Sequence, residues 1–470
     1  MKDVLISKKI LYFSFILLTV QFCSVYSNNF SVFAQDNNIV DTQYKMKVLQ
    51  KIDSLLQTKY VLPEMAKKYA AEFREKYENG DYNSCRNSEE FAVQITADLF
   101  AITNDKHIKF RVIESSNIGE KPENSLHHPI RYHILGINEN KGFSRIEWME
   151  GNIGYLDIRR FYLYPDIQDL VDCSMNLLLN ANAIIIDLRE NGGGSGDYLS
   201  SYFLKYPTQL NSWYSRENDF VTEFWTSQKT GLERLTEVPL FLLTSKRTFS
   251  AAESFAYDMK VQKRATIVGD STKGGAHSVD LYKIDNQFEI YISTARAINP
   301  VTGGNWEGTG VTPDVIVPSV SALDTAIILA RRAAVEIARV KDAKLKLAIE
   351  EMQIHMNRAE LLFRENKNHE AKTALDSVFH IADKHDLITE FFLDVLAYNY
   401  FSQKDELILY AILKKKIEFF PKSPTAYETM AYAHYKNNKK EPAIAYYEKV
   451  LKLDPHNRNA KKMIKRIRNE

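Results

Sequence analysis

The chain has 470 residues, of which 45% are hydrophobic and 26% charged, as is ordinary for globular proteins. This length predicts two or three domains, and the composition argues against long disordered stretches. The 61 basic and 60 acidic residues give a formal net charge of +1. A general nucleic-acid binder needs a basic excess on one face, so we expect no nucleic-acid partner.

The N-terminus has the pattern of an export signal. Lys8 and Lys9 precede the mostly apolar run Ile10–Phe22, and small residues follow it. The pattern predicts a signal peptide of residues 1–27, with cleavage as late as Ala34. The apolar run is too short to predict a membrane-spanning helix in the mature protein. We therefore expect an exported protein, either periplasmic or extracellular.

Three cysteines leave several interpretations open. Cys23 ends the apolar run and would allow a lipoprotein anchor, but Gln21 and Phe22 differ from the small residues that such processing prefers. Anchoring at Cys23 is therefore the minor alternative. Cys85 and Cys173 would remain after signal removal, either as a disulfide, which export permits, or as two free thiols. The sequence has no Cys/His cluster with the spacing of a zinc site, so we expect no metal.

Apolar residues at helical spacing begin after the signal. Met46, Leu49 and Ile52 start this pattern, which predicts an N-terminal helical section over residues 42–112. The section ends in a short strand-like run, Ile108–Ile113.

Strands and helices then alternate, and we expect residues 113–320 to form one α/β domain. Ala183–Leu188 and Pro239–Thr244 are continuous apolar runs, which are typical of parallel strands buried on both faces. The other predicted elements are strands at Ile130–Ile137, Phe143–Trp148, Ile153–Ile158, Ala265–Val268 and Phe288–Ala295, and helices at Pro165–Asn180 and Ala251–Val261.

The character of the sequence changes near Ser319, after which helix formers dominate. The last stretch fits the small and large positions of a tetratricopeptide repeat, with Tyr427, Ala431, Ala443, Tyr447 and Pro455. A middle unit matches moderately and a first unit, around Ala359 and Ala371, weakly. We expect helical repeats over residues 345–470, whose concave face would offer a surface for a protein partner. A plain helical bundle is the alternative.

A predicted buried strand leads directly into Gly192, Gly193 and Gly194. Glycines at a strand end let backbone N–H groups face a ligand without side-chain obstruction. Such groups can bind a phosphate or a developing oxyanion. The spacing matches neither a dinucleotide fingerprint nor a P-loop. A tight turn that requires positive φ is the structural alternative.

Ser250 follows the second apolar run across a short loop and opens a predicted helix. Its hydroxyl would lie near the positive end of the helix, and the N–H of Ala251 would be free to stabilise an oxyanion. Taken alone, Ser250 is better explained as an N-cap, because Glu253 three residues later completes a capping box.

A nucleophilic serine needs a base, for which histidine and lysine are the common choices. His107 lies in a polar loop before a strand, and Lys273 is the competing candidate. Glu307 would either orient a base or cap a turn. None of these residues is conclusive alone.

Taken together, these stretches resemble the tail-specific serine peptidases, which include the C-terminal processing peptidases and the tricorn core peptidase. The resemblance covers about Thr42 to Pro318, and its motifs occur in the family's order: Asp-x-His, Asp-Leu-Arg-x-Asn-Gly-Gly-Gly, Thr-Phe-Ser-Ala-Ala-Glu, Gly-x-x-Thr-x-Gly-Gly and Trp-Glu-Gly-x-Gly-Val-x-Pro-Asp. It implies an α/β catalytic domain with a crotonase/ClpP-like sheet, which we expect between the N-terminal helical section and the C-terminal all-α repeat domain predicted above. It also implies a polypeptide substrate, and it implies no cofactor.

The resemblance assigns the nucleophile and the oxyanion hole. Ser250 would attack the peptide carbonyl, and the oxyanion would bind the N–H of Ala251 and that of Gly193 or Gly194. We therefore expect an exported serine endopeptidase that acts through an acyl-enzyme.

The family contains two kinds of catalytic base. Processing peptidases use a lysine, but Gly275 occupies its place here and Lys273 lies two residues early. The tricorn-like branch uses a histidine supported by a glutamate, and His107 and Glu307 match those positions. One departure is Lys106, which stands where tricorn has a serine that links the histidine to the glutamate. Glu307 would therefore reach His107 directly or through water, or the neighbouring aspartate would assist.

A second departure is a missing domain. Only about 40 residues separate Val112 from Gly151, too few for the PDZ domain that processing peptidases usually carry. Two alternatives to a peptidase remain at this point. One is an inactive protein of the same fold that binds peptides or small ligands, and the other is a scaffold whose repeats carry the function.

Overall fold

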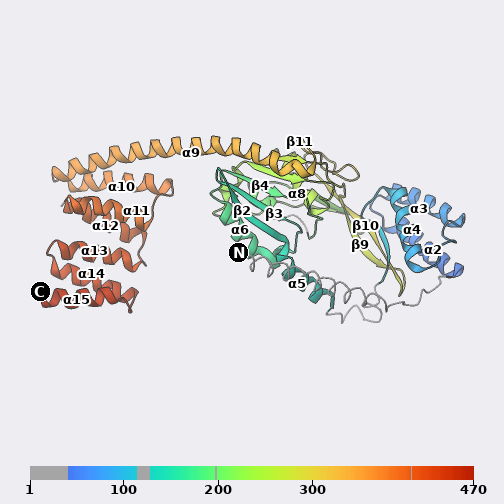
Figure 1. Cartoon of the computed structure of the whole chain (residues 1–470), viewed down its shortest axis with the longest axis horizontal. Helices are drawn as coiled ribbons and strands as arrows, with labels where there is room; N and C mark the ends of the chain where they lie inside the picture. Colours follow the sequence, from blue (N-terminus) through green and yellow to red (C-terminus); the bar gives the residue numbers. More distant parts are fainter. Residues whose placement is uncertain (1–40, 114–126, 196–197, 404) are drawn as a thin grey trace, which may run out of the picture. The chain divides into compact units, whose positions relative to one another are not determined.

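The computed structural model describes residues 41–113, 127–195, 198–403 and 405–470. The predicted signal peptide and Cys23 lie outside these residues. The chain forms two compact units, Met1–Val335 and Glu336–Glu470, whose elements are labelled in Figure 1.

The first unit contains a six-stranded sheet. Its strands are β2 (Phe143–Met149), β3 (Ile153–Ile158), β4 (Ala183–Asp187), β7 (Leu240–Thr244), β8 (Ala265–Gly269) and β11 (Val315–Ile316). Their order is β11-β8-β7-β4-β3-β2, and all neighbours are parallel except the β2–β3 pair. Strands β4 and β7 are buried along their whole length, which confirms the prediction made from their continuous apolar runs.

Helices cover both faces of this sheet. α6 (Tyr164–Leu178) and α8 (Ala251–Val261) share a buried cluster with Ile184, whereas the start of α9 (Ser319–Arg364) packs in a second cluster with Ile185. Successive residues of β4 thus serve opposite faces, as the pleat of a strand requires. Since β4 and β7 end at the same edge, the loops that follow them meet there.

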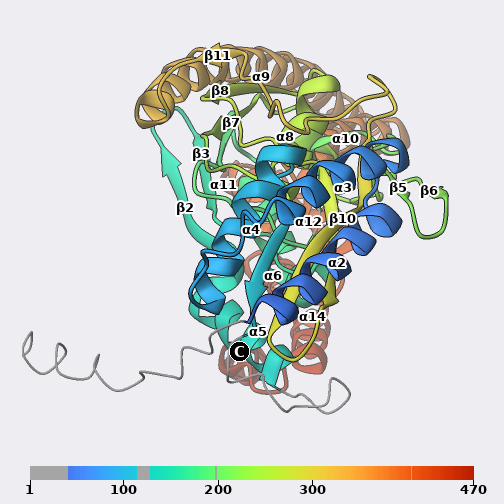
Figure 2. The same cartoon turned by 90° about the vertical axis from the view of Figure 1, so that its right-hand side faces the viewer.

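The first unit also contains an antiparallel sheet, against which the N-terminal helices pack (Figure 2). Its strands are β1 (Lys109–Val112), β5 (Ser212–Ser215), β6 (Phe220–Thr222), β9 (His277–Lys283) and β10 (Phe288–Ile298), and the helices are α2 (Thr42–Lys59), α3 (Pro63–Glu78) and α4 (Ser88–Thr103). The sequence predicted the helices, β1 and β10, but not β5, β6 and β9. β6 is exposed at every residue, and β9 is exposed at Ser278, Asp280, Leu281 and Lys283. Neither strand therefore carries a continuous apolar run.

One predicted strand is wrong. Residues Ile130–Ile137 lie in a helix, α5 (His127–Asn138). The apolar residues Ile130, Ile134 and Ile137 are spaced four and three apart, which is the helical period and not the alternation of a strand. The remaining short elements of the unit are the 3-10 helices η3 (Asn140–Gly142) and η4 (Glu233–Thr236) and helix α7 (Ser200–Phe203).

The second unit is helical throughout the part that the structure describes. After the end of α9, its helices are α10 (Asn368–Lys384), α11 (Glu390–Ser402), α12 (Glu406–Phe419), α13 (Pro424–Lys436), α14 (Lys440–Leu453) and α15 (Arg458–Asn469). The small residues predicted at the helix contacts, Ala371, Ala397, Ala431 and Ala443, are buried. They allow paired helices to approach closely, which confirms the repeat pattern in this unit.

Two of the three cysteines, Cys85 and Cys173, lie among the described residues. Cys85 and Cys173 are both free thiols, so the disulfide alternative is wrong. No helix among the described residues combines the length and apolarity needed to cross a bilayer.

Candidate active site

Ser250 lies at a strained turn between β7 and α8. Its φ of 55° and ψ of −120° lie outside the regions that residues with a side chain normally adopt. Such strain persists only where the surroundings enforce it, and it is concentrated at functional sites. The backbone N–H of Ser250 donates to Glu253 Oε2 at 2.8 Å, as the predicted capping box requires.

The side chain of Glu253 holds this turn in place through hydrogen bonds. Its carboxylate is fully buried and also accepts the N–H groups of Gly274 and Gly275, at 2.6 and 2.9 Å, and the hydroxyl of Thr272 at 2.5 Å. Burial raises the pKa of Glu253, although these donors oppose that shift. Glu253 therefore joins the Ser250 turn to the segment that follows β8.

The glycine loop after β4 reaches the same turn. A Cβ on Gly193, whose φ is +96°, would lie 2.8 Å from the Phe249 carbonyl oxygen and 3.1 Å from the backbone nitrogen of Ala251. Only glycine allows this close approach. The N–H of Gly193 itself donates to Asn191 Oδ1 at 2.8 Å. Among the described residues, no acceptor pairs with the N–H of Ala251 or of Gly194, so these two are the available donors.

A cavity of about 590 Å³ opens beside Ser250. Gly194, Ala251, Gly275 and His277 also line it. Its other walls combine aromatic side chains, which are Tyr164, Tyr198, Trp213, Phe224, Trp225 and Trp306, with polar ones, among them Asn211, Ser254 and Asp258. The cavity therefore offers aromatic and polar surface next to the serine and to the two N–H groups that have no acceptor among the described residues.

His107 lies next to this turn, with its side chain 10% exposed. Its ring stacks on Phe249, with centroids 4.4 Å apart and an interplanar angle of 28°. Neither ring nitrogen has a hydrogen-bond partner among the described residues, and no hydrogen bond joins His107 to Ser250. Burial lowers the pKa of His107 to about 4. His107 is thus a neutral imidazole with both nitrogens unused.

Glu307 does not contact His107 in the described structure. Its carboxylate accepts the N–H groups of Ala276 and His277, and Oε2 lies 3.8 Å from Nδ1 of His277. Its other oxygen, Oε1, is buried without a partner. Burial raises the pKa of Glu307 to about 7. The glutamate matched from the sequence is therefore present at the site, but it faces a different histidine.

That histidine, His277, was missed by the sequence analysis. It begins β9, is buried, and its Nδ1 lies 2.8 Å from Asp105 Oδ2. Burial lowers the pKa of His277, but the hydrogen bond and charge of Asp105 outweigh burial and raise it above its ordinary value. The sequence did contain one signal for His277. It lies two residues after Gly275, in the segment that was compared with the family's lysine motif.

The two lysines considered earlier point elsewhere. The Nζ of Lys106 donates to the backbone carbonyl of Lys273, and Lys273 Nζ lies over the Phe249 ring at 4.5 Å from its centroid. Lys106 therefore does not stand between His107 and Glu307.

Asp105, His277 and Glu307 also form the one cluster in the described residues whose ligand atoms could converge on a metal, since these atoms lie within 4.8 Å of one another. The 2.8 Å between His277 Nδ1 and Asp105 Oδ2 is a hydrogen-bond length. Two ligands of a tetrahedral zinc ion, each at about 2.0 Å from it, lie roughly 3.3 Å apart. A shared proton fits this pair better than a metal ion does.

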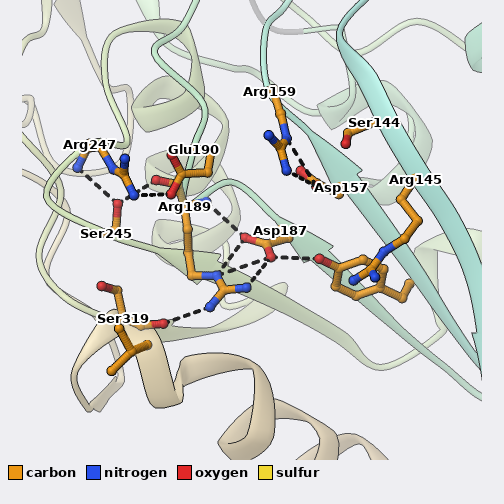
Figure 3. A pocket seen from close by; sticks show the side chains of 12 residues that line it. Ser144, Arg145, Asp157, Arg159, Asp187, Arg189, Glu190, Ser245, Arg247 and Ser319 are labelled. Atoms are coloured by element: carbon orange, nitrogen blue, oxygen red, sulfur yellow. Dashed lines mark hydrogen bonds and ion pairs between the residues drawn. The ribbon is translucent and has the colours of Figure 1, made fainter. Parts of the chain in front are cut away.

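A second cavity, of about 470 Å³, lies at the carboxyl ends of β3 and β4 and is strongly polar (Figure 3). Asp187 accepts from Tyr155 Oη at 2.7 Å and from Arg189 Nη2 at 2.6 Å, and Arg189 also donates to the carbonyl of Ser319 in α9. Arg159 pairs similarly with Asp157. The charged groups here satisfy one another, so this cavity is explained as a structural network.

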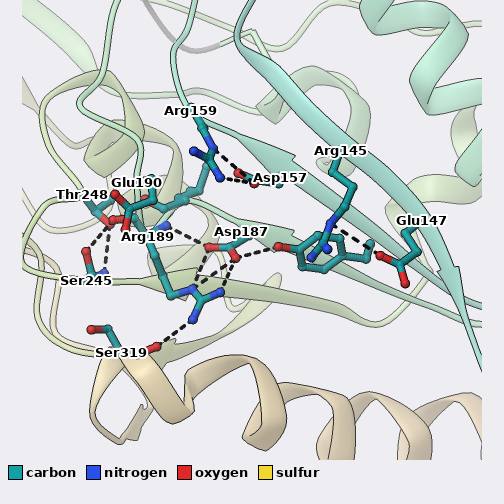
Figure 4. Close-up of polar contacts among 12 residues, drawn as sticks. Arg145, Glu147, Asp157, Arg159, Asp187, Arg189, Glu190, Ser245, Thr248 and Ser319 are labelled. Carbon is teal, nitrogen blue, oxygen red and sulfur yellow. Dashed lines mark hydrogen bonds and ion pairs between the residues drawn. The ribbon is translucent and has the colours of Figure 1, made fainter. Parts of the chain in front are cut away.

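Residues of the same network also join the loops that follow β4 and β7 (Figure 4). Ser245 Oγ donates to the carbonyl of Arg189, and Thr248 Oγ1 donates to that of Leu188. These bonds join the loop after β7, which carries Ser250, to the loop after β4, which carries the glycines. The position of Ser250 relative to the glycine loop is therefore held by the side chains of Ser245 and Thr248.

Three family models match the chain. Residues 152–317 match peptidase family S41, residues 32–144 match the N-terminal domain of Peptidase_S41 in eukaryotic IRBP, and residues 424–457 match a tetratricopeptide repeat.

Two curated relatives are similar over about a third of the chain. The tail-specific protease of Haemophilus influenzae is 30% identical over 183 residues, which are 36% of this chain and 25% of that protein. The carboxy-terminal-processing protease of Bartonella bacilliformis is 28% identical over 176 residues, 36% of this chain and 39% of that protein. The chain thus spans well under half the length of these relatives. The solved photosystem II D1 C-terminal processing protease overlaps 58% of this chain and 93% of its own, with 14% identity and a TM-score of 0.37.

Proposed function

Because the chain carries a peptidase family S41 domain at residues 152–317 and a tetratricopeptide repeat at residues 424–457, we propose that it is an exported serine endopeptidase. The observation that carries the proposal is the strained turn at Ser250, which lies beside two backbone N–H groups without acceptors among the described residues and beside a cavity with aromatic walls. A helix cap alone requires neither the positive φ of Ser250 nor the N–H of Gly194, which lacks an acceptor in the described part of the chain.

The proposed reaction is acyl transfer. His107 takes the proton from Ser250 Oγ as the oxygen attacks a peptide carbonyl, and it later gives that proton to the leaving amine. The oxyanion binds the N–H of Ala251 and that of Gly194, because the N–H of Gly193 is already used. One such donor lowers the barrier by about 3 kcal/mol. Water then releases the acyl-enzyme and restores the serine.

The substrate is a polypeptide with an apolar side chain near the scissile bond. The aromatic walls of the cavity beside Ser250 would bury such a side chain. Between Val112 and Gly151, the described residues form α5, η3 and β2, and β2 belongs to the main sheet. We propose that no PDZ domain selects the substrate, and that the helical repeats bind a protein partner.

Labelling of Ser250 tests the proposal. A fluorophosphonate reacts with a serine only if a base activates it and an oxyanion hole stabilises the adduct. We expect the purified protein to gain one adduct, which peptide mass spectrometry places on Ser250. A folded protein that gains none would favour the alternative of a binding protein, which the unpaired ring of His107 supports. Catalytic hydrogen bonds are, however, often absent until substrate binds.

Gly275→Ala should slow this labelling by about 10-fold to 100-fold, because small displacements of a catalytic group have effects of that size. A Cβ at Gly275 would lie 2.6 Å from Cε1 of His107 and 2.2 Å from Cε2 of Phe249, so the imidazole must move. Gly304→Ala is the matched control, since nothing lies within 4 Å of its added Cβ. Equal labelling rates in the two variants would show that the position of His107 is unimportant.

A further inference from the structure

His277 connects the two acidic side chains of the site. Its Nδ1 lies 2.8 Å from Asp105 Oδ2 and 3.8 Å from Glu307 Oε2. Its ring also lies edge-on to Tyr60, whose hydroxyl donates to the same Asp105 oxygen at 3.2 Å. Glu307 is therefore linked to Asp105 through His277.

Asp105 is the carboxylate next to His107. Its Oδ1 accepts the backbone N–H of His107 at 3.0 Å and lies 4.0 Å from Nδ1 of the His107 ring. The contacts thus run in the order Glu307, His277, Asp105 and His107. This chain of contacts connects Glu307 to His107 without involving the side chain of Lys106, which bonds to the carbonyl of Lys273.

The effect of Asp105 depends on its charge. Its side chain is 1% exposed, and an isolated carboxyl group so deeply buried would bind a proton. Burial does raise the pKa of Asp105, but the hydrogen bond and charge of His277, together with the backbone N–H of His107 and the hydroxyl of Ser293, outweigh burial and bring it below its ordinary value. An ionised carboxylate about 4 Å from an imidazole stabilises the imidazolium that forms when the ring accepts a proton.

We propose that His277 is a positioning residue, whose Nδ1 hydrogen bond holds the Asp105 carboxylate oriented toward His107 while the serine is attacking. This inference rests on the proposed peptidase activity. Asp105, Glu307 and the phenol of Tyr60 face His277, and Arg296 contributes a repulsive positive charge. Of these, only Asp105 lies within hydrogen-bond distance of the His277 ring.

Two substitutions separate the hydrogen bond of His277 from its ring. Asparagine can place an amide N–H near the position of Nδ1, whereas leucine fills the space with no donor. We expect His277→Leu to slow fluorophosphonate labelling of Ser250 by about 10-fold to 100-fold, less than loss of the base itself. We expect His277→Asn to label at a rate between those of His277→Leu and the natural protein.

The pH dependence supplies a readout that a merely structural role would not change. Without the donor, the pKa of Asp105 rises, so Asp105 becomes neutral at a higher pH. The fall in labelling rate on acidification should therefore begin at a higher pH in His277→Leu than in the natural protein. His277→Asn should show a smaller shift in the same direction.

His456→Asn is the matched control, because His456 is exposed and lies in the second unit. Melting temperatures check that each variant folds, and if His277→Leu does not fold, the pH profile of His277→Asn decides. The inference is overturned if the variants label like the natural protein, with an unshifted profile. It is also overturned if both variants lose as much as His107→Ala, since His277 would then be the base. A folded natural protein that gains no adduct refutes the peptidase proposal itself.

Discussion

Ser250→Ala is expected to abolish peptide cleavage, with a loss of about 10⁶-fold in kcat, as in serine peptidases that lose their nucleophile. No other described hydroxyl combines a strained strand-to-helix turn with unpaired N–H groups of the Ala251 and Gly194 kind. Peptide binding should be largely retained, because the aromatic cavity beside the serine is unchanged. Cleavage of an unfolded protein substrate, followed by mass spectrometry of the products, measures the loss.

Ser377→Ala provides the control for this experiment. Ser377 lies on α10 in the second unit, and its hydroxyl bonds only to the backbone of its own helix. The Ser377→Ala variant should cleave the substrate at the natural rate. Natural-like cleavage by purified Ser250→Ala would show that the reaction uses another nucleophile, or that a contaminating peptidase produced it.

The main sheet was predictable because its central strands are stable only where both of their faces are buried. The residues of β4 and β7 are apolar at successive positions, and a segment of that kind must be covered on both faces. α5 was missed because its apolar run is short, although Ile130, Ile134 and Ile137 within it have helical spacing. The family was predictable from the order of its motifs, and the matches to peptidase family S41 and to a tetratricopeptide repeat confirm it.

The neighbours of His107 could not be predicted in the same way. His277 meets Asp105 only because β9 pairs with β10, which in turn pairs with β1 just after His107. β9 itself was not predicted, because its exposed face removes the apolar signal. A motif comparison identifies residue types at known positions, and it does not identify a partner supplied by an unpredicted strand. The orienting role assigned to Glu307 therefore stays a prediction. In the structure, the side chain next to Glu307 is that of His277.

His107→Ala should lower kcat/KM by about 10²-fold to 10⁴-fold, the usual contribution of a general base. The fold should be retained, because the ring makes no hydrogen bond to the described residues and its loss leaves no partner unsatisfied. The residual rate would come from the oxyanion donors and from substrate binding. Fluorophosphonate labelling of Ser250 should fall in parallel, which separates a chemical defect from weaker peptide binding.

The pH profile of the natural protein identifies the base. A base acts when deprotonated, so the rate rises with pH through its pKa and is constant above it. Burial lowers the pKa of His107 to about 4, so kcat/KM should already be near its plateau at pH 6. If His277 were the base, the rise would lie above the ordinary histidine value of about 6.5, because Asp105 raises the pKa of His277. A rise near pH 4 that disappears in His107→Ala would assign the base to His107, whereas a rise above 6.5 that persists in this variant would assign it to His277.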